Sequence, residues 1–201
     1  MEALSAQLLR LPDDTASGRI LQVLGVDCPS LPAQHVTSLL RPLARRKRSI
    51  LLQRTLESLE EFGLQSNVVH RNLLLSAYER LSHWQHAIAE LRNLRDCSLE
   101  ATAVTMSSVS SACTKASQWQ KALDVFQDTR FKDTICFNVA IAACARGQRW
   151  ISAVRLLREM QASKVPVDEI SYNSAINACV EWQTALALLA EMKEAKRGYI
   201  W

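Results

Sequence analysis

Cysteine and histidine are the side chains best suited to metal binding or nucleophilic chemistry, and their spacing in this sequence favours neither. No two of the six cysteines form the C-x-x-C pair of a zinc ribbon or a dithiol redox site. His83 and His86 lie close together in the chain, but no acidic residue or cysteine completes a ligand set with them. The sequence also has no glycine-rich phosphate loop and no G-x-S-x-G motif. We therefore expect a protein that is not an enzyme and that uses no metal and no cofactor.

A polar side chain recurs at one position along the chain, three places after an aliphatic one. The polar residues, whose numbers differ by 35, 31 and 35, are Asn72, Ser107, Asn138 and Asn173. The aliphatic residues are Val69, Val104, Ile135 and Ile170. Amide and hydroxyl side chains are mediocre helix formers, so their recurrence needs an explanation. Two explanations remain open: the polar residue caps a helix, or it binds the edge of an unpaired base while the aliphatic residue rests against the base plane.

A cation recurs with the same periodicity. The members of this series, whose numbers differ by 35, 35 and 31, are Arg45, Arg80, Lys115 and Arg146. One cation per interval predicts a ladder along one face, which suits a phosphate backbone. Ordinary solvated charges are the alternative, and Glu181 interrupts the series at the next position.

These intervals are the period of a helical repeat. Trp84, Trp119 and Trp150 are spaced in the same way, and periods of this length are typical of a solenoid. Apolar residues at helical spacing predict two helices per unit, near 69–81 and 83–95 and near 104–116 and 118–129. We expect the tryptophans, which open the second helices, and the small residues around Cys113, Cys144 and Cys179 to pack in the core.

The period divides the chain into six predicted segments. They are an N-terminal capping segment 1–32, a degenerate repeat 33–67, a repeat 68–102, a short repeat 103–133, a repeat 134–168 and a truncated repeat 169–201. Pro42 is expected to interrupt the first helix of the degenerate repeat. The truncated repeat is three positions shorter between Cys179 and Trp182 than its neighbour is between Cys144 and Trp150. Either its turn is tightened or its two helices fuse in part.

Composition sets only broad limits on the partner. The chain is 48% hydrophobic, and its net charge of +4 is compatible with a nucleic acid without indicating one. A membrane-spanning helix needs about 20 consecutive apolar residues. No apolar run in the sequence approaches that length, so we expect no membrane partner.

The unit TICFNVAIAACARGQRWISAVRLLREMQASKVPVD (134–168) and the following EISYNSAINAC resemble the pentatricopeptide repeat family. The resemblance is strong across 68–192, weaker over 33–67 and absent from 1–32. It implies an all-α fold, a right-handed α-solenoid of antiparallel helix pairs like that of tetratricopeptide repeats, which binds single-stranded RNA at about one base per repeat. It also implies a non-catalytic role in organellar RNA processing, stability or translation, in a mitochondrion or plastid. Other RNA-processing proteins are expected as further partners, and a small-molecule substrate is not.

In this family the polar residue of the first helix and the last residue of the same repeat select the base. The resemblance therefore implies that Thr37 with Asn67 selects A, Ser107 with Asp133 selects G, and Asn138 with Asp168 selects U. Asn72 with Thr102 matches no base well, and Asn173 has no assigned partner because its repeat is shortened. A protein-interaction scaffold of the tetratricopeptide kind is the alternative function, in which these polar residues would be dispensable.

Overall fold

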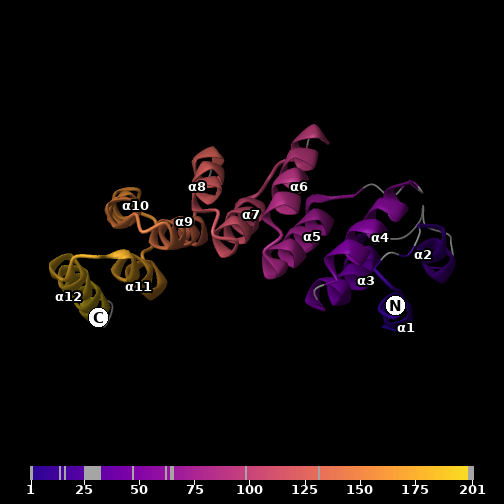
Figure 1. The fold of residues 1–201 in the computed structure, drawn as a ribbon, viewed down its shortest axis with the longest axis horizontal. Coiled ribbons are helices and arrows are strands. Elements are labelled where there is room, and N and C mark those ends of the chain that lie inside the picture. The colour runs from indigo at the N-terminus through magenta and orange to yellow at the C-terminus, as the bar shows by residue number, and fades with distance from the viewer. Residues whose placement is uncertain are drawn as a thin grey trace. The chain divides into compact units, whose positions relative to one another are not determined.

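Apolar residues at helical spacing produce helices throughout the computed structural model, which describes residues 2–13, 15, 17–24, 33–46, 48–61, 63, 66–97, 99–130 and 132–198 (Figure 1). These described residues form twelve helices and no strand, which confirms the all-α prediction. The helices are α1 (Glu2–Leu8), α2 (Ser17–Leu24), α3 (Ala33–Arg45), α4 (Ser49–Glu61), α5 (Val68–Leu81), α6 (Trp84–Asp96), α7 (Ala103–Lys115), α8 (Trp119–Asp128), α9 (Thr134–Arg146), α10 (Trp150–Ala162), α11 (Glu169–Ala178) and α12 (Trp182–Gly198). The four helices predicted between positions 69 and 129 form within one residue of their expected ends.

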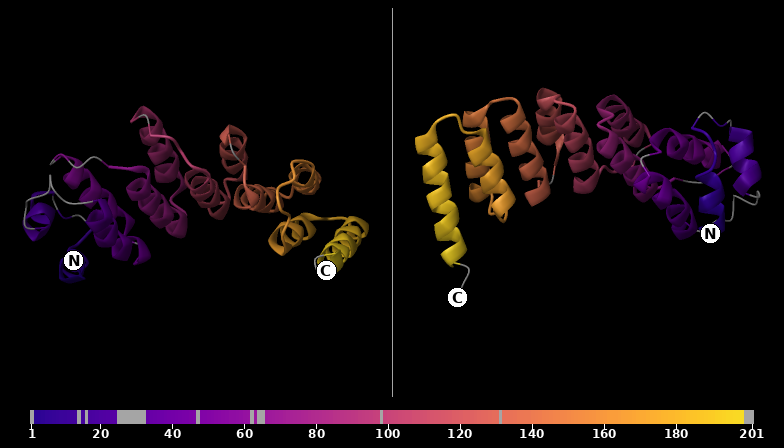
Figure 2. Two further views of the ribbon diagram at one scale, coloured as in Figure 1. Left: turned by 180° about the vertical axis from the view of Figure 1, so that it is seen from behind. Right: turned by 60° about the horizontal axis from the view of Figure 1, so that its bottom comes forward.

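The helices belong to two units, residues 1–101 and 102–201. In the first unit α3 packs against both α1 and α5, while α2 packs against α4, so α1 and α2 continue the arrangement of the helix pairs that follow them. In the second unit α9 packs between α7 and α11. The second helices each cover their own first helix, and α8 and α10 also cover the next one (Figure 2). Each unit is thus a stack of helix pairs, as a solenoid requires.

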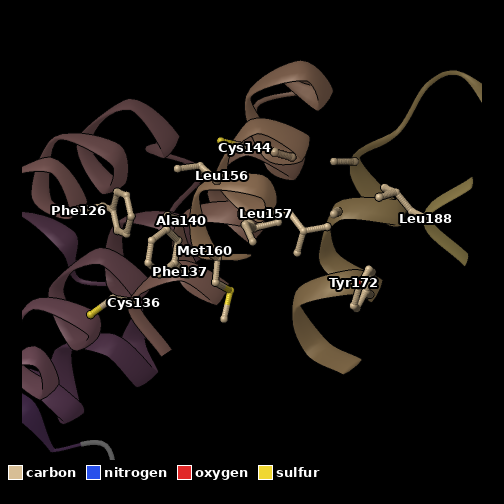
Figure 3. Close-up of a cluster of buried hydrophobic side chains, with 14 residues drawn as sticks. Phe126, Cys136, Phe137, Ala140, Cys144, Leu156, Leu157, Met160, Tyr172 and Leu188 are labelled. Carbon is tan, nitrogen blue, oxygen red and sulfur yellow. The ribbon is translucent and has the colours of Figure 1, made fainter. Parts of the chain in front are cut away.

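The core of the second unit lies between neighbouring helix pairs. Phe137 and Ile141 of α9 are at most 1% exposed, as are Leu157 and Met160 of α10, and Tyr172 of α11 closes the cluster at 6% (Figure 3). Burying each of these large side chains contributes about 1.5–3 kcal/mol. Because the cluster draws on α8 to α12, from three successive repeats, no repeat buries it alone.

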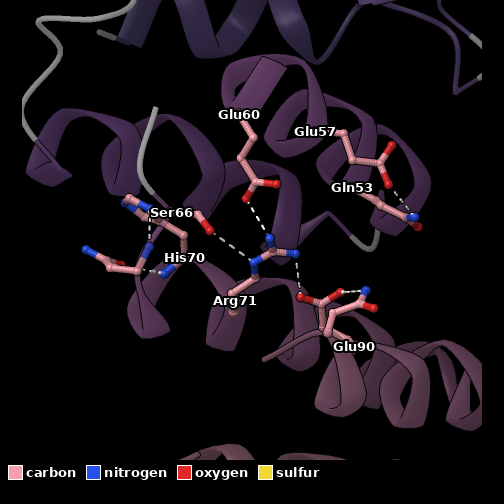
Figure 4. Close-up of polar contacts among 9 residues, drawn as sticks. Gln53, Glu57, Glu60, Ser66, His70, Arg71 and Glu90 are labelled. Atoms are coloured by element: carbon pink, nitrogen blue, oxygen red, sulfur yellow. Dashed lines mark hydrogen bonds and ion pairs between the residues drawn. The ribbon is translucent and has the colours of Figure 1, made fainter. Parts of the chain in front are cut away.

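An ion-pair network ties three helices of the first unit together. The guanidinium of Arg71 in α5 donates to Glu60 Oε1 of α4 and to Glu90 Oε1 of α6, each at 2.7 Å (Figure 4). Burial lowers the pKa of Arg71, but Glu90 and Glu60 outweigh that effect, so its pKa is raised and the charge is permanent. Removing Arg71 would leave the buried Glu90 without its cation.

Pro42 does not interrupt its helix, so that prediction is wrong. α3 runs through Pro42 from Ala33 to Arg45. Its buried face, Val36, Leu39, Leu40 and Leu43, extends on both sides of the proline and is at most 1% exposed. An interior proline costs about 3 kcal/mol, less than the burial of four aliphatic side chains contributes.

The three missing residues of the truncated repeat are absorbed by its first helix. α9 has 13 residues and α11 has 10. The turn between α11 and α12 is as long as the turn between α9 and α10. Both expectations for this repeat, a tightened turn and partly fused helices, are therefore wrong. Position 181, where Glu181 interrupts the cation series, lies in this turn and not in a helix.

Cysteines and tryptophans pack as expected, with one exception. Cys113 and Cys144 are fully buried, and the described cysteines are free thiols. Trp119 and Trp150 open α8 and α10 and are half-buried, whereas Trp182 at the start of α12 is 68% exposed. Within the described ranges, no helix is both long and apolar enough to cross a bilayer.

Gly147, in the turn after α9, allows a close approach to Trp119 of the preceding repeat. Replacing it in Gly147→Ala would place a Cβ 2.6 Å from Cδ2 and 2.8 Å from Cγ of the Trp119 ring. We expect this overlap to destabilise the protein by about 1–3 kcal/mol. Thermal unfolding followed by circular dichroism should show a lower Tm. The matched control is Gly18→Ala in α2, where a Cβ meets nothing within 4 Å and alanine favours the helix. Equal Tm values for the two variants would contradict this account of Gly147.

Candidate functional site

A cleft of about 420 Å³ in the second unit gathers six of the residues singled out by the sequence. α7, α9 and α11 line it, so it spans three successive repeats. The predicted members are Lys115, Ile135, Asn138, Arg146, Asp168 and Ile170. Ser111, Thr114 and Ser174 add hydroxyl groups to its wall. Amide, carboxylate, aliphatic and cationic groups thus meet in one cavity, although they come from three helices that are separated in the chain.

Asn138 and Asp168 form the polar centre of this cleft. Asn138 Nδ2 donates to Asp168 Oδ1 at 3.1 Å and to Oδ2 at 3.2 Å. Asp168 is also the N-cap of α11, because its side chain accepts from the backbone N–H of Ser171 at 2.8 Å. The cap fixes the carboxylate, and the carboxylate in turn orients the amide.

The hydrogen bonds keep Asp168 charged. Burial opposes ionisation, but donors from Ser171 and Asn138 outweigh it and hold the pKa of Asp168 below its ordinary value. The group therefore remains an acceptor at neutral pH. A negative charge beside a phosphate would be unfavourable, so the carboxylate can act here by orienting Asn138.

The four aliphatic residues of the sequence series lie at the starts of their helices with their side chains outward. Each is more than half exposed: Val69 53%, Val104 57%, Ile135 57% and Ile170 61%. Burial of apolar surface is favourable, so four exposed β-branched residues at one repeat position suggest a surface that is covered in a complex.

Helix capping does not explain the polar series. The N-caps of α5, α7, α9 and α11 are Asn67, Thr102, Asp133 and Asp168. Asn72, Ser107, Asn138 and Asn173 each lie more than a turn beyond a cap, inside the helix. The capping residues are instead the predicted second members of the base-selecting pairs.

The neighbouring pair is not connected in the same way. The Ser107 hydroxyl donates to the Val104 carbonyl of its own helix at 3.0 Å. Asp133 caps α9 by accepting from the backbone N–H of Cys136 at 2.8 Å. The structure thus brings the amide and carboxylate of Asn138 and Asp168 into contact, and it directs Ser107 and Asp133 to backbone groups.

The first unit has its own cleft, of about 790 Å³, lined by residues of α1, α3 and the start of α5 and by their neighbours in the chain. Thr37, Asn67 and Val69 line it together with Arg45. Arg41 and Arg46 add two further cations, which makes this cavity the more basic of the two.

The remaining predicted residues are placed individually. Asn72 is half-buried on α5, and Thr102 caps α7 in the other unit. Asn173 is exposed on α11.

All four cations of the series are exposed and occupy the last turn of α3, α5, α7 or α9. A cation there also stabilises the helix through its dipole, by about 0.3–1 kcal/mol. Their regular spacing is therefore explained in part by helix stability. Arg48, by contrast, is a structural residue: its guanidinium binds Asp13 at 2.7 Å and the carbonyls of Leu9 and Leu11.

Sequence reasoning missed Ser171. Its hydroxyl lies 2.6 Å from Asn138 Oδ1 and 2.8 Å from Asp168 Oδ1, and the residue is fully buried. The available signal was the D-x-x-S spacing from Asp168, since a polar residue three positions after an N-cap is typical of a capping box.

Comparisons with known proteins agree with this architecture. A family model described as PPR repeat matches residues 104–131, and one described as PPR repeat family matches residues 132–181. A comparison with curated protein sequences found no match.

Two solved structures share the fold. One is the pentatricopeptide repeat protein PPR10 in complex with an 18-nt psaJ RNA element, with a TM-score of 0.70, 23% identity and 94% of this chain covered. This chain spans only 26% of the length of that PPR10 chain. The other is the PPR domain of Arabidopsis thaliana protein-only RNase P 1 in complex with tRNA, with a TM-score of 0.69, 12% identity, 82% of this chain covered and 91% of that domain. The chain therefore contains pentatricopeptide repeats, which the family models place at residues 104–131 and 132–181.

Proposed function

We propose that this protein binds single-stranded RNA along the first helix of each repeat and selects bases there. The observation that carries the proposal is the second-unit cleft, in which Asn138 and Asp168 lie between the exposed Ile135 and Ile170. An unpaired base has an apolar face and a polar edge. The cleft offers aliphatic surface for the face and an oriented amide for the edge.

The cations of the cleft complete the match to a nucleotide. Lys115 and Arg146 line the same cavity and stand at the ends of α7 and α9. Cations that succeed one another along a stack of repeats can follow a phosphate backbone. A peptide ligand would also use the aliphatic surface, but a row of cations favours a polyanion.

The solved relatives support the ligand class. PPR10 was solved with an RNA element and the PPR domain of RNase P 1 with tRNA. By the family's pairing rule, the site of Asn138 and Asp168 selects U, that of Ser107 and Asp133 selects G, and that of Thr37 and Asn67 selects A. We further propose that the protein acts in processing, stability or translation of transcripts in a mitochondrion or plastid, with other RNA-processing proteins as partners.

We propose a non-catalytic role. Burial raises the pKa of Cys113, Cys136 and Cys144 to about 11, so these thiols stay protonated and are poor nucleophiles at neutral pH. Among the described residues, no three side chains of His, Cys, Asp or Glu lie together so that they could hold a metal ion.

The experiment that tests the function is selection of a randomised single-stranded RNA pool by the purified chain, followed by sequencing of the bound fraction. Enrichment of a G-U step would support the sites of Ser107/Asp133 and Asn138/Asp168 together. Binding without enrichment would leave an electrostatic RNA binder. A folded protein that binds no RNA would instead favour the protein-interaction scaffold.

We expect Asn138→Ala to relax base selection at one RNA position. One oriented base contact is worth about 1–3 kcal/mol, so the preference for the selected base should fall by roughly tenfold. Dissociation constants for four RNAs that differ only at that position measure the change. Asn177→Ala is the matched control, because Asn177 is an exposed asparagine of α11 that is not among the residues lining the cleft. An equal loss of affinity for all four RNAs would speak against base reading by Asn138.

We expect Arg146→Gln to weaken binding to every RNA alike. The loss of one phosphate contact on a single strand should lower the slope of log K against log salt concentration by about 0.7. Binding isotherms between low and moderate salt measure that slope. Arg155→Gln is the control, because Arg155 is exposed on α10 and does not line the cleft. If the two variants have the same slope, Arg146 does not contact the RNA backbone.

A further inference from the structure

We infer that Ser171 is a positioning residue for base selection: its buried hydroxyl fixes which edge of the Asn138 amide faces the RNA. The inference rests on the proposed function and adds a third member to the site. Ser171 belongs to the truncated repeat, so the base-reading site of repeat 134–168 is completed by the first turn of its neighbour.

The geometry places Ser171 behind the amide. Ser171 Oγ lies 2.6 Å from Asn138 Oδ1 and 2.8 Å from Asp168 Oδ1. The backbone N–H of Asp168 donates to the same hydroxyl oxygen at 3.3 Å. Ser171 is fully buried, and among the described residues its hydroxyl has one other acceptor, the Met160 sulfur at 3.6 Å, which is a weak one. The single hydroxyl proton therefore has two oxygen acceptors within reach, and Asn138 Oδ1 is the nearer.

The two partners of Asn138 contact opposite ends of its amide. The Asp168 carboxylate accepts only, and it faces Nδ2 at 3.1 and 3.2 Å. The Ser171 hydroxyl faces Oδ1 and can donate to it. Exchanging the two amide atoms would set Oδ1 against the carboxylate, two acceptors in contact, and would take Oδ1 away from the hydroxyl that can donate to it.

A fixed amide has a fixed order of donor and acceptor along its outward edge. One N–H of Nδ2 and one lone pair of Oδ1 remain for a ligand. At ring positions 4 and 3 uracil presents an acceptor and then a donor, whereas cytosine presents a donor and then an acceptor. An amide that cannot turn over therefore prefers one of the two bases. An amide held only by Asp168 can tilt and accept both more equally.

The preceding repeat has a cysteine in place of this serine, so its polar residue has no hydroxyl behind it. The position equivalent to Ser171 is Cys136, whose thiol donates to the carbonyl of Ala103 at 3.7 Å. Ser107, the counterpart of Asn138, there donates to the Val104 carbonyl of its own helix. A weak thiol donor is thus accompanied by a polar side chain that turns back to its helix.

The shortened α11 retains the turn that this site needs. Its three-residue deletion falls at the C-terminal end, whereas Asp168 and Ser171 form the N-terminal cap. The first turn of the truncated repeat therefore still holds the polar groups around Asn138.

The test compares Ser171→Ala with Ser171→Thr. Alanine removes the hydroxyl, and threonine keeps it; Thr105 is fully buried at the equivalent position of α7 and shows that threonine fits such a site. The readout is a ratio of two dissociation constants: that for the RNA with C at the position read by Asn138, divided by that for the RNA with U there. We expect Ser171→Ala to lower this ratio about two- to tenfold, the range expected for one hydrogen bond. Ser171→Thr should keep it, and selection at the position read by Ser107 should not change.

A second readout needs no RNA. Exchange of the Asn138 side-chain amide protons, followed by NMR, should accelerate in Ser171→Ala and remain slow in Ser171→Thr. If Ser171→Ala does not fold, Ser171→Cys replaces it, since Cys136 shows that a buried thiol is accepted at this position.

The outcomes separate the two proposals. A wild-type protein that shows no preference at this position would overturn the proposed function, and the inference with it. A wild-type preference that persists unchanged in Ser171→Ala would overturn the role of Ser171 alone. A uniform loss of affinity with an unchanged ratio of the two dissociation constants would likewise show that Ser171 is only a structural residue.

Discussion

A carboxylate that caps a helix cannot turn away without uncapping it, and Asp168 is under this constraint. It accepts from the backbone of Ser171 at 2.8 Å and from the amide of Asn138 at 3.1 and 3.2 Å. The cap contributes about 1 kcal/mol to helix stability. The same interaction therefore starts α11 and orients a side chain of the preceding repeat, so the fold and the candidate site share one set of hydrogen bonds.

This cap reaches Asn138 only because neighbouring helix pairs are packed together. Tyr172 and Ala175 of α11 are buried in one cluster with Phe137 and Ala140 of α9. In a solenoid such contacts exist only between neighbours. A candidate site that is built from two repeats thus depends on the interface between them, and an isolated repeat would have the residues without the geometry.

Stacking also explains which sequence irregularities the chain tolerates. Pro42 stays inside α3 because the helix face that carries Leu39 and Leu43 is buried on both sides of it. The deletion in the last repeat shortens α11 at its C-terminal end and leaves the capped N-terminal turn in place. In α3 side-chain burial outweighs the local signal of the proline, so a reading of local propensities alone predicted the wrong outcome.

The sequence alone determined the all-helical repeat, the boundaries of α5 to α8 and the residues at each repeat position. Period and apolar spacing suffice for these features, because they depend on contacts between residues close in the chain. Only the tertiary structure decided which polar groups meet. Asn138 and Ser107 occupy equivalent positions, yet one binds the carboxylate of the next helix cap and the other a carbonyl of its own helix. That choice depends on the reach of each side chain, an amide or a short hydroxyl, and on hydrogen-bond distances across two repeats, which no periodicity specifies.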